Sequence, residues 1–327
     1  MFLLHDNGQE VEDRIIAYTT TQNLEQLNTA TTWLCDSTFA TCPIIFKQLW
    51  VLHEQFNDQV MPFVFFLLPD AKTEVYTRAF KIVRDALSSL PTNQLPPLTH
   101  ATRAKPSSAE KDESTLAAEQ LAHARLLGPK VIIMDFEQEQ FRAFEVTFNG
   151  EVWGCFFHFR QALIKNLKSK KELFNKYLND DKGKCHFAIT QFAALAFMRP
   201  EHTGLGFEAL LGDTYVKKHS IIFKGYLEYF EKQWVGKKVT SQRGKSGATA
   251  PWNCQGACLK GEMKTISSLE VWQKHLNTKF GSNPKYNKFF AKLQEEQARN
   301  VSKFCNLTTQ VAPKKKKSKE QEYQEAV

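Results

Sequence analysis

The hydrophobic and polar positions in the first 90 residues predict three strands followed by a helix. Apolar stretches at 33–39, 44–53 and 60–68 follow one another, and short polar segments separate them. Short apolar runs bounded by polar turns are typical of consecutive strands that pair as a meander. Residues 73–83 then place apolar side chains at helical spacing, with Thr73 as the candidate N-cap.

After residue 129 the pattern alternates between strands and helices. A compact apolar run at 130–135 predicts a buried strand. The following residues predict a helix over 137–148, a strand over 151–157 and a basic helix over 160–177. The order is therefore three strands, helix, strand, helix, strand, helix, which indicates an α/β fold with a mixed sheet.

The remaining segments differ in composition from this core. Residues 91–128 are rich in Pro, Ser, Thr, Glu and Lys and predict an exposed insertion. Residues 185–233 are helical by pattern, and 237–250 form a basic loop rich in Gly and Ser. Two helices, over 263–280 and 284–304, are expected to close the fold.

Composition and charge limit the classes of function. The chain has 327 residues, of which 42% are hydrophobic and 24% charged, so it is a folded globular protein and not a wholly disordered or collagen-like one. Its net charge of +8 suits a polyanionic partner. The longest apolar run, 60–69, is about half of the roughly 20 residues that a membrane helix needs, so we expect no membrane span. Seven cysteines, an odd number, argue for a reducing compartment and against a disulfide framework.

Two carboxylates occur in apolar strands. Asp36 lies inside the run 33–39, and Asp135 ends the run 130–135. Burying a carboxylate is costly unless it is paired or binds a metal ion. If the two strands are neighbours, the carboxylates form a cation site of the kind that phosphodiester chemistry uses. The alternative is that each aspartate ends its strand facing solvent.

Several blocks of sequence, in order, resemble the Mutator-like element (MULE) transposase domain. The segment 33–39, continuing through 46–50, is similar to the first block of that family, and 133–137 and 154–162 continue the pattern. The similarity covers roughly residues 14–297. It implies an RNase H-like α/β fold, with a mixed sheet flanked by helices and a mainly helical insertion before the third acidic residue of a DDE triad.

The resemblance also implies which residues are catalytic. Asp36 and Asp135 match the first two acids, and Glu270, in a block similar to the family's third, is our choice for the last. Together they would hold two divalent ions, Mg²⁺ or Mn²⁺, for cleavage and transfer of DNA strands. The implied partner is DNA at transposon ends, and because two ends must be paired, a homodimer is compatible with this function.

The sequence departs from the family pattern beside these acids. Ser37 and Val271 stand where the family has Gly, Gln273 stands where it has His, and 266–267 replace Asn-Asn. These departures leave an alternative open: a transposon-derived DNA-binding protein or fragment without catalytic activity.

Cys155 and His158 form the C-x-x-H signature that follows the second aspartate in such transposases. Cys and neutral His at this spacing could share a zinc ion, but two ligands do not complete a tetrahedral site. Cys254 and Cys258, or residues 185–186, are candidates to complete it. The alternative is a packing role at the corner between strand and helix.

Basic residues on the predicted helix and in the Gly/Ser loop could neutralise DNA phosphates, with binding that weakens steeply as salt increases. An ordinary solvated surface is the alternative. The candidate contacts are Arg160, Lys165, Lys168, Lys170, Lys171, Lys238, Arg243 and Lys245.

The domain organisation follows from these assignments. Residues 1–30 are a lead-in, and 31–305 are the RNase H-like domain, interrupted by the exposed insertion 91–128 and the mainly helical insertion 178–262. Residues 306–327 are expected to be a disordered basic tail. The tail contains the run Lys-Lys-Lys-Lys-Ser-Lys, which is typical of nuclear import signals, so we expect a nuclear protein.

Overall fold

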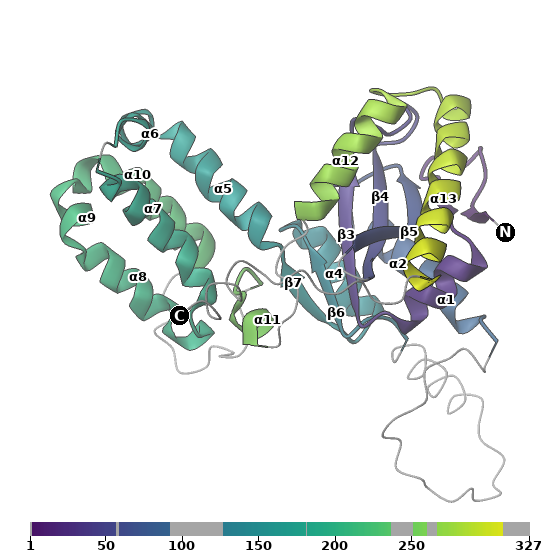
Figure 1. Ribbon diagram of the computed structural model, residues 1–327, viewed down its shortest axis with the longest axis horizontal. Helices are drawn as coiled ribbons and strands as arrows, with labels where there is room; N and C mark the ends of the chain where they lie inside the picture. The colour runs from purple at the N-terminus through teal and green to yellow at the C-terminus, as the bar shows by residue number, and fades with distance from the viewer. Residues whose placement is uncertain are drawn as a thin grey trace, which may run out of the picture.

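A computed structural model describes residues 2–56, 59–91, 127–180, 182–236, 251–259 and 267–309. Figure 1 shows two lobes joined by one long helix: a sheet with helices on both faces, and a lobe made of helices alone. The predicted insertion 91–128 falls almost wholly outside the described residues, as do the basic loop 237–250 and the tail beyond 309.

A seven-stranded mixed sheet forms the first lobe, in the order β1-β2-β5-β4-β3-β6-β7. Its strands are β1 (Leu3–Asp6), β2 (Ile16–Tyr18), β3 (Thr32–Thr38), β4 (Gln48–Phe56), β5 (Gln59–Leu68), β6 (Val131–Met134) and β7 (Glu151–Gly154). The pairs β3–β6 and β6–β7 are parallel, and the other neighbours are antiparallel. This sheet confirms the predicted α/β class and is compatible with an RNase H-like fold.

Two strand boundaries differ from the pattern. The strand predicted over 44–53 begins only at Gln48, because Pro43 starts a turn in which its carbonyl accepts from the Phe46 N–H (2.9 Å). Ile44 and Ile45 are therefore exposed, at 81% and 63%. The strand predicted over 151–157 ends at Gly154, because α5 (Phe156–Ser169) begins two residues later.

The residues before Thr31 are part of the sheet, although their pattern predicted no element. β2 pairs antiparallel with β5 and β1 pairs with β2, which extends the sheet beyond the predicted strands. β2 is only three residues long and buried throughout, so it shows no alternation of apolar and polar positions. A guanidinium-to-carboxylate contact between Arg14 and Asp6 (2.6 Å) joins the ends of the two added strands.

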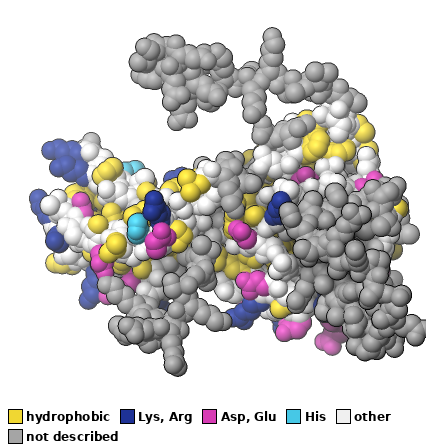
Figure 2. Space-filling view, turned by 90° about the horizontal axis from the view of Figure 1, so that it is seen from below, with side chains coloured by type: hydrophobic (Ala, Val, Ile, Leu, Met, Phe, Trp, Pro, Cys, Tyr) yellow, Lys and Arg dark blue, Asp and Glu magenta, His cyan; other side chains and the backbone are white. Residues whose placement is uncertain are grey.

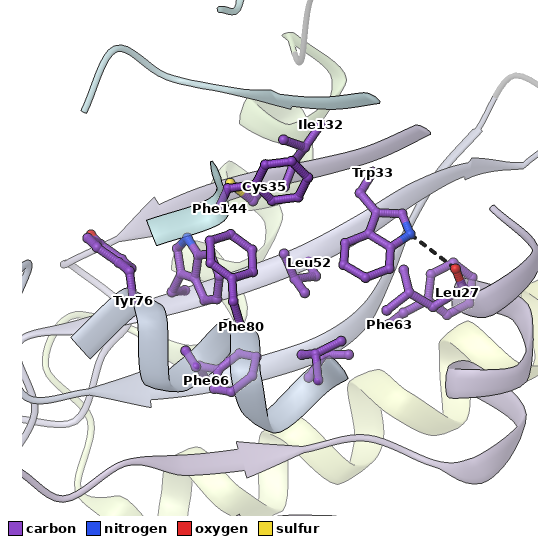
Figure 3. Close-up of a cluster of buried hydrophobic side chains, with 14 of the residues drawn as sticks. Leu27, Trp33, Cys35, Leu52, Phe63, Phe66, Tyr76, Phe80, Ile132 and Phe144 are labelled. Carbon is purple, nitrogen blue, oxygen red and sulfur yellow. Dashed lines mark hydrogen bonds between the residues drawn. The ribbon is translucent and has the colours of Figure 1, made fainter. Parts of the chain in front are cut away.

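Three helices cover one face of the sheet: α1 (Thr21–Thr29), α2 (Thr73–Ser88) and α4 (Gln138–Thr147). Large aromatic side chains from both layers form the core between them (Figure 3), among them Trp33, Trp50, Phe66, Phe80 and Phe144. The buried Trp33 Nε1 donates to the Leu27 carbonyl (3.0 Å), which ties α1 to β3.

Thr73 is not the N-cap of α2. The helix begins at Thr73, and the capping position is Lys72, whose side chain makes no capping hydrogen bond. Thr73 already has helical geometry, so its hydroxyl is not in the position from which an N-cap accepts the first free N–H groups.

Two long helices cover the opposite face: α12 (Ser267–Phe280) and α13 (Tyr286–Thr309). Apolar residues of these helices pack against the outward side chains of β2, β4 and β5, and they include Leu276, Phe280, Phe289 and Leu293. The sheet is thus sandwiched between two helical layers, as its apolar central strands require.

The second lobe has its own hydrophobic core. It contains α6 (Lys171–Leu178), α7 (Lys184–Ala194), α8 (Thr203–Gly212), α9 (Thr214–Lys218), α10 (Ser220–Phe230) and α11 (Gln255–Leu259), with 3₁₀ turns at Leu195–Phe197 and Pro200–His202 and a π-helical turn at Glu231–Val235. The basic helix predicted over 160–177 is in fact two helices, α5 and α6, because the chain leaves helical geometry at Lys170 (φ −98°, ψ 81°). None of the helices in the described part of the chain has the length and apolar character of a membrane span.

Glu54, near the end of β4, is a carboxylate in a mostly apolar environment. Glu54 is only 9% exposed, and its carboxylate accepts a hydrogen bond from Gln26 Nε2 (3.2 Å). Burial raises the pKa of Glu54 from 4.5 to about 7, although the bond from Gln26 acts in the opposite direction. The folded protein therefore favours the protonated carboxyl.

We expect Glu54→Gln to remove a pH dependence of stability. The raised pKa means that the protonated carboxyl stabilises the fold fully below about pH 4.5 and loses this contribution as pH rises through about 7. The variant should match the wild type near pH 4.5 and be more stable at pH 8 by on the order of 2 kcal/mol. Thermal denaturation across this range measures it. The exposed Glu145→Gln is the control, and a wild-type pH profile in the Glu54 variant would contradict the expectation.

Candidate functional site

The two candidate aspartates lie on neighbouring parallel strands. In the register of β3 and β6, Leu34 is opposite Ile133, and continuing it by two residues brings Asp36 opposite Asp135. Adjacent paired strands are about 4.8 Å apart, so a register continued to these positions makes the two residues neighbours. Asp36 is inside β3 and Asp135 directly follows β6, so the carboxylates meet at the same end of the sheet.

Both aspartates are in a partly desolvated environment. Asp36 is 8% exposed, and its Oδ1 accepts a hydrogen bond from the Ser37 N–H (2.8 Å). Burial raises the pKa of the Asp135 carboxyl, and the Glu137 N–H (3.3 Å) only partly offsets this. Burial, followed by the charges of Asp135 and Asp36, also raises the pKa of the Cys35 thiol, which directly precedes Asp36 in the chain. A carboxylate with a raised pKa gains from a nearby cation.

An open pocket of about 510 Å³ lies in front of Asp135. One wall is α5, whose residues 158, 161, 162 and 165 share one helix face. The full lining is Ser37, Phe39, Asp135, Phe136, Glu137, His158, Gln161, Ala162 and Lys165. The pattern of the sequence did not single out Phe39 or Gln161, although the spacing from His158 to Gln161 and Lys165 was a usable signal.

The helix that contains Glu270 lies against the same face. Leu269 is fully buried in a cluster with Leu34 and Ile133, and alternation along β3 places Asp36 on the side of Leu34. One turn later, Gln273 Nε2 donates to the Ser37 carbonyl (3.1 Å). Glu270 lies between these two contacts on α12, and the position of its side chain lies outside the described residues.

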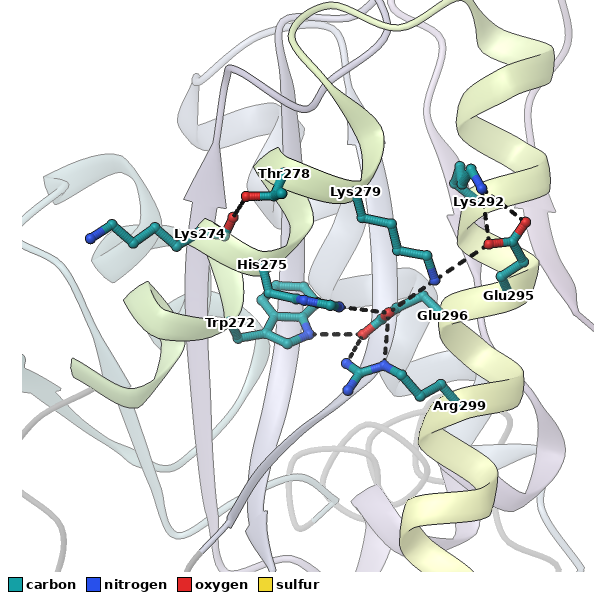
Figure 4. Close-up of polar contacts among 9 residues, drawn as sticks. All are labelled: Trp272, Lys274, His275, Thr278, Lys279, Lys292, Glu295, Glu296 and Arg299. Carbon is teal, nitrogen blue, oxygen red and sulfur yellow. Dashed lines mark hydrogen bonds and ion pairs between the residues drawn. The ribbon is translucent and has the colours of Figure 1, made fainter.

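A buried carboxylate on α13 fixes α12 in this position (Figure 4). Glu296 is 0% exposed, and it accepts from Trp272 Nε1 (3.2 Å) and pairs with Lys279 (3.5 Å), both on α12. Arg299, on α13 itself, also donates to Glu296. Burial alone would raise the pKa of Glu296, but the hydrogen bonds and charge of Arg299, with Trp272 and Lys279, hold it below its ordinary value.

Glu137 joins the pocket through a polar network beneath it. Its carboxylate accepts from the Tyr76 hydroxyl (3.0 Å) and from Gln140 Nε2 (2.6 Å). Gln140 Oε1 in turn accepts from Trp50 Nε1 (3.3 Å) and the Cys35 thiol (3.2 Å). The network connects β3, β4, α2 and α4, so it fixes the segment that follows Asp135.

Cys155 and His158 occupy different surroundings. Cys155 is fully buried in the cluster with Leu269, and its N–H donates to the Met134 carbonyl (2.8 Å), whereas His158 lines the pocket. Cys185 and Cys254 belong instead to the core of the helical lobe. Within the described ranges, no three or more His, Cys, Asp or Glu side chains converge as a metal site would need.

The basic residues of α5 divide between helix faces. Lys165 lines the pocket, and the exposed Lys168 follows it by three residues on the same side. Arg160 is two residues from His158, about 200° around the helix, so it points away from the pocket. Lys165 is therefore the α5 cation that shares the pocket with Asp135.

The other candidate DNA contacts are less favourably placed or lie outside the described part. Lys170 rests on α10, because a Cβ at Gly225 would lie 3.2 Å from its Nζ. Lys171 is exposed at the start of α6. Lys238, Arg243 and Lys245 fall outside the described residues.

Comparison with protein-family models, with curated proteins and with solved structures finds no match to this chain. The interpretation of the site therefore depends on its own geometry: aspartates on two neighbouring parallel strands, a pocket that Asp135 lines, and a helix with Lys165 along one wall of that pocket.

We expect Glu296→Gln to destabilise the attachment of α12. The Gln amide keeps the shape of the side chain and the hydrogen bond from Trp272, but it lacks the negative charge that pairs with Arg299 and Lys279. The free energy of unfolding at pH 7 should therefore fall by an amount on the order of 2 kcal/mol. Because the pKa of Glu296 is lowered, its contribution is present above pH 4.5 and is lost as pH falls through the folded pKa. Thermal denaturation at pH 7 and pH 3 measures both effects.

The neighbouring Glu295→Gln is the matched control. Its side chain is 53% exposed and pairs with Lys292, so its loss should cost less than about 0.5 kcal/mol. Equal destabilisation by the two variants would show that the buried contacts of Glu296 stabilise the fold no more than the exposed ion pair of Glu295 does.

Proposed function

We propose that the chain is a Mutator-like DDE transposase that cleaves and joins DNA strands at transposon ends. The observation that supports this most is the parallel pairing of β3, which contains Asp36, with β6, which Asp135 follows directly beside a pocket that Asp135 lines. The ordered blocks of sequence similarity to the MULE transposase domain support it independently.

The residues at this site fit divalent cations. Asp36 and Asp135 supply carboxylate oxygens, the ligands that Mg²⁺ and Mn²⁺ prefer, and the raised pKa of Asp135 marks a charge that a cation would stabilise. In this proposal Glu270 completes the set from α12. When bound, two such ions supply activation of the attacking hydroxyl and stabilisation of the leaving oxygen.

The side chains of the chain itself bind and orient the DNA strand. Lys165, on the wall of the pocket, neutralises a phosphate next to the carboxylates, and Gln161 donates hydrogen bonds to its oxygens. Phe39, 57% exposed and at the opening, offers an aromatic face to a base or sugar. No covalent bond between the protein and DNA is needed, because a water and then a 3′-hydroxyl attack the phosphorus directly.

The proposal also includes a partner, an oligomeric state and a location in the cell. DNA is the partner, in agreement with the net charge of +8, and a homodimer would pair two ends. The basic run near the C-terminus would direct the protein to the nucleus.

A second candidate function is a transposon-derived DNA-binding protein without catalytic activity. Gln273 and Ser37, two of the positions that depart from the family pattern, touch each other through the Ser37 carbonyl (3.1 Å). Ser37 directly follows Asp36, and Gln273 lies about one helical turn after Glu270, so two of the departures contact each other close to candidate acids.

Metal binding can be tested without knowledge of the DNA sequence. Calorimetric titration with Mn²⁺ should give saturable binding to the wild type and at least a tenfold loss in Asp36→Asn and in Asp135→Asn, because each variant removes one anionic ligand. Asp85→Asn, an exposed aspartate on α2, is the control. Since the pKa of Asp135 is raised, Mn²⁺ competes with a proton there, and wild-type affinity should increase from pH 5 to pH 7.5.

Cleavage separates the two candidate functions. Nicking of duplex DNA that depends on Mn²⁺ and disappears in Asp135→Asn would exclude the non-catalytic candidate. A folded wild type that binds DNA but neither binds Mn²⁺ nor nicks DNA, even with both present, would overturn the transposase proposal.

A further inference from the structure

The helical lobe contains a second pocket, of about 770 Å³, that the catalytic proposal does not use. Its lining includes four lysines, Lys176, Lys182, Lys184 and Lys218, and we call it the lysine pocket. The lysines come from α6, from the turn before α7, and from α7 and α9. Segments separated by up to 42 residues thus bring their cations to one hollow.

The positive charge of the lysine pocket is not balanced by its own acids. Among the described residues, no carboxylate lies within ion-pair distance of any of the four lysines. Among the described residues of the lining, Asp213 is the only carboxylate, and its Oδ1 already accepts from the N–H groups of Tyr215 (2.8 Å) and Val216 (3.0 Å) as the N-cap of α9. Four cations around a hollow repel one another, and a multivalent anion relieves that repulsion.

The backbone adds to this field. α7, of 11 residues, begins at the pocket after Gly183, whose positive φ of 65° turns the chain into the helix. The positive end of the helix dipole therefore points toward the lysines. The Asp180 carboxylate accepts from the His186 N–H (2.9 Å) in the first turn of α7. Because this contact already uses one of the free N–H groups at the helix start, the lysines remain the main source of positive charge.

The position of the lysine pocket relates it to the catalytic pocket. α5 starts beside the catalytic pocket and runs to α6, which contains Lys176 (Figure 1). Its 14 residues span about 21 Å, roughly two-thirds of a turn of B-form DNA. Lys165 and Lys168 lie along that path, and Figure 2 shows further Lys and Arg side chains at the outer edge of the helical lobe.

We propose that the lysine pocket binds backbone phosphates of the duplex whose strand enters the catalytic pocket. This inference depends on the proposed function for the identity of the polyanion. Exposed lysines contact phosphate without reading bases, so the pocket contributes affinity and orientation and no sequence preference. The duplex then lies along α5, held at both ends of that helix.

The test compares two double variants that remove the same charge. Lys184→Ala/Lys218→Ala changes the lysine pocket, and Lys81→Ala/Lys288→Ala changes exposed lysines on α2 and α13 of the other lobe. Binding of a fluorescent 30-base-pair duplex is measured by anisotropy between 50 and 200 mM salt. For the pocket variant we expect at least a tenfold loss of affinity and a salt slope smaller by about 2, since each phosphate contact contributes about 0.9. The control variant should stay within about twofold of the wild type.

Each other outcome is informative. Equal losses in both variants would overturn the inference, because total charge and not the pocket would then decide binding. A second outcome is that the wild type nicks DNA and the pocket variant binds DNA as tightly as the wild type. That result would overturn the inference and leave the proposed function intact. A pocket-specific loss of affinity in a chain that never nicks DNA would support the inference and count against the transposase.

A small phosphate compound is the other source of the same chemistry. Calorimetry with inorganic phosphate tests it directly, and saturable binding that is lost in Lys184→Ala/Lys218→Ala, without any effect of that variant on DNA, would overturn the duplex proposal. Circular dichroism confirms that each variant is folded, and Lys184→Gln/Lys218→Gln, which keeps side-chain length, replaces the alanine pair if that pair unfolds.

Discussion

The parallel pairing of β3 with β6 is the constraint on which the candidate site depends. Leu34 opposite Ile133 fixes a register in which Asp36 meets Asp135, and a shift of one residue would turn one aspartate to the opposite face of the sheet. Both strands are buried between helical layers, so the register is specified by apolar contacts on each side. The hydrophobic effect thus holds two carboxylates in a place where burial makes their charge unfavourable.

Helices on the two sides of the sheet have different tasks. On one side, α2 and α4 supply an aromatic core and the Tyr76, Gln140 and Glu137 network beneath the pocket. On the other side, the buried Glu296 joins α12 to α13 and so determines where the helix with Glu270 lies against β3. The site is therefore held by contacts on both faces of the sheet.

α5 connects the pocket that Asp135 lines with the helical lobe. Its first turn follows β7 and lines the pocket before Asp135, while its buried residues Phe159, Leu163 and Leu167 belong to the core of the helical lobe. α5 therefore extends from the pocket that Asp135 lines into the core of the helical lobe. Such an arrangement suits a long, regularly charged ligand better than a small one.

The sequence by itself determined the order of strands and helices from β3 to α5, and it showed one aspartate inside an apolar run and one at the end of another, because burial along a single chain appears as periodicity and as unbroken apolar runs. Tertiary structure decided what periodicity does not encode. The strands β1 and β2 are too short to show a pattern, the chain leaves helical geometry at Lys170, and the candidate zinc ligands Cys155 and Cys254 lie in different cores. The contact of Gln273 with Ser37 and the gathering of four lysines join residues far apart in sequence, and only the folded chain brings such residues together.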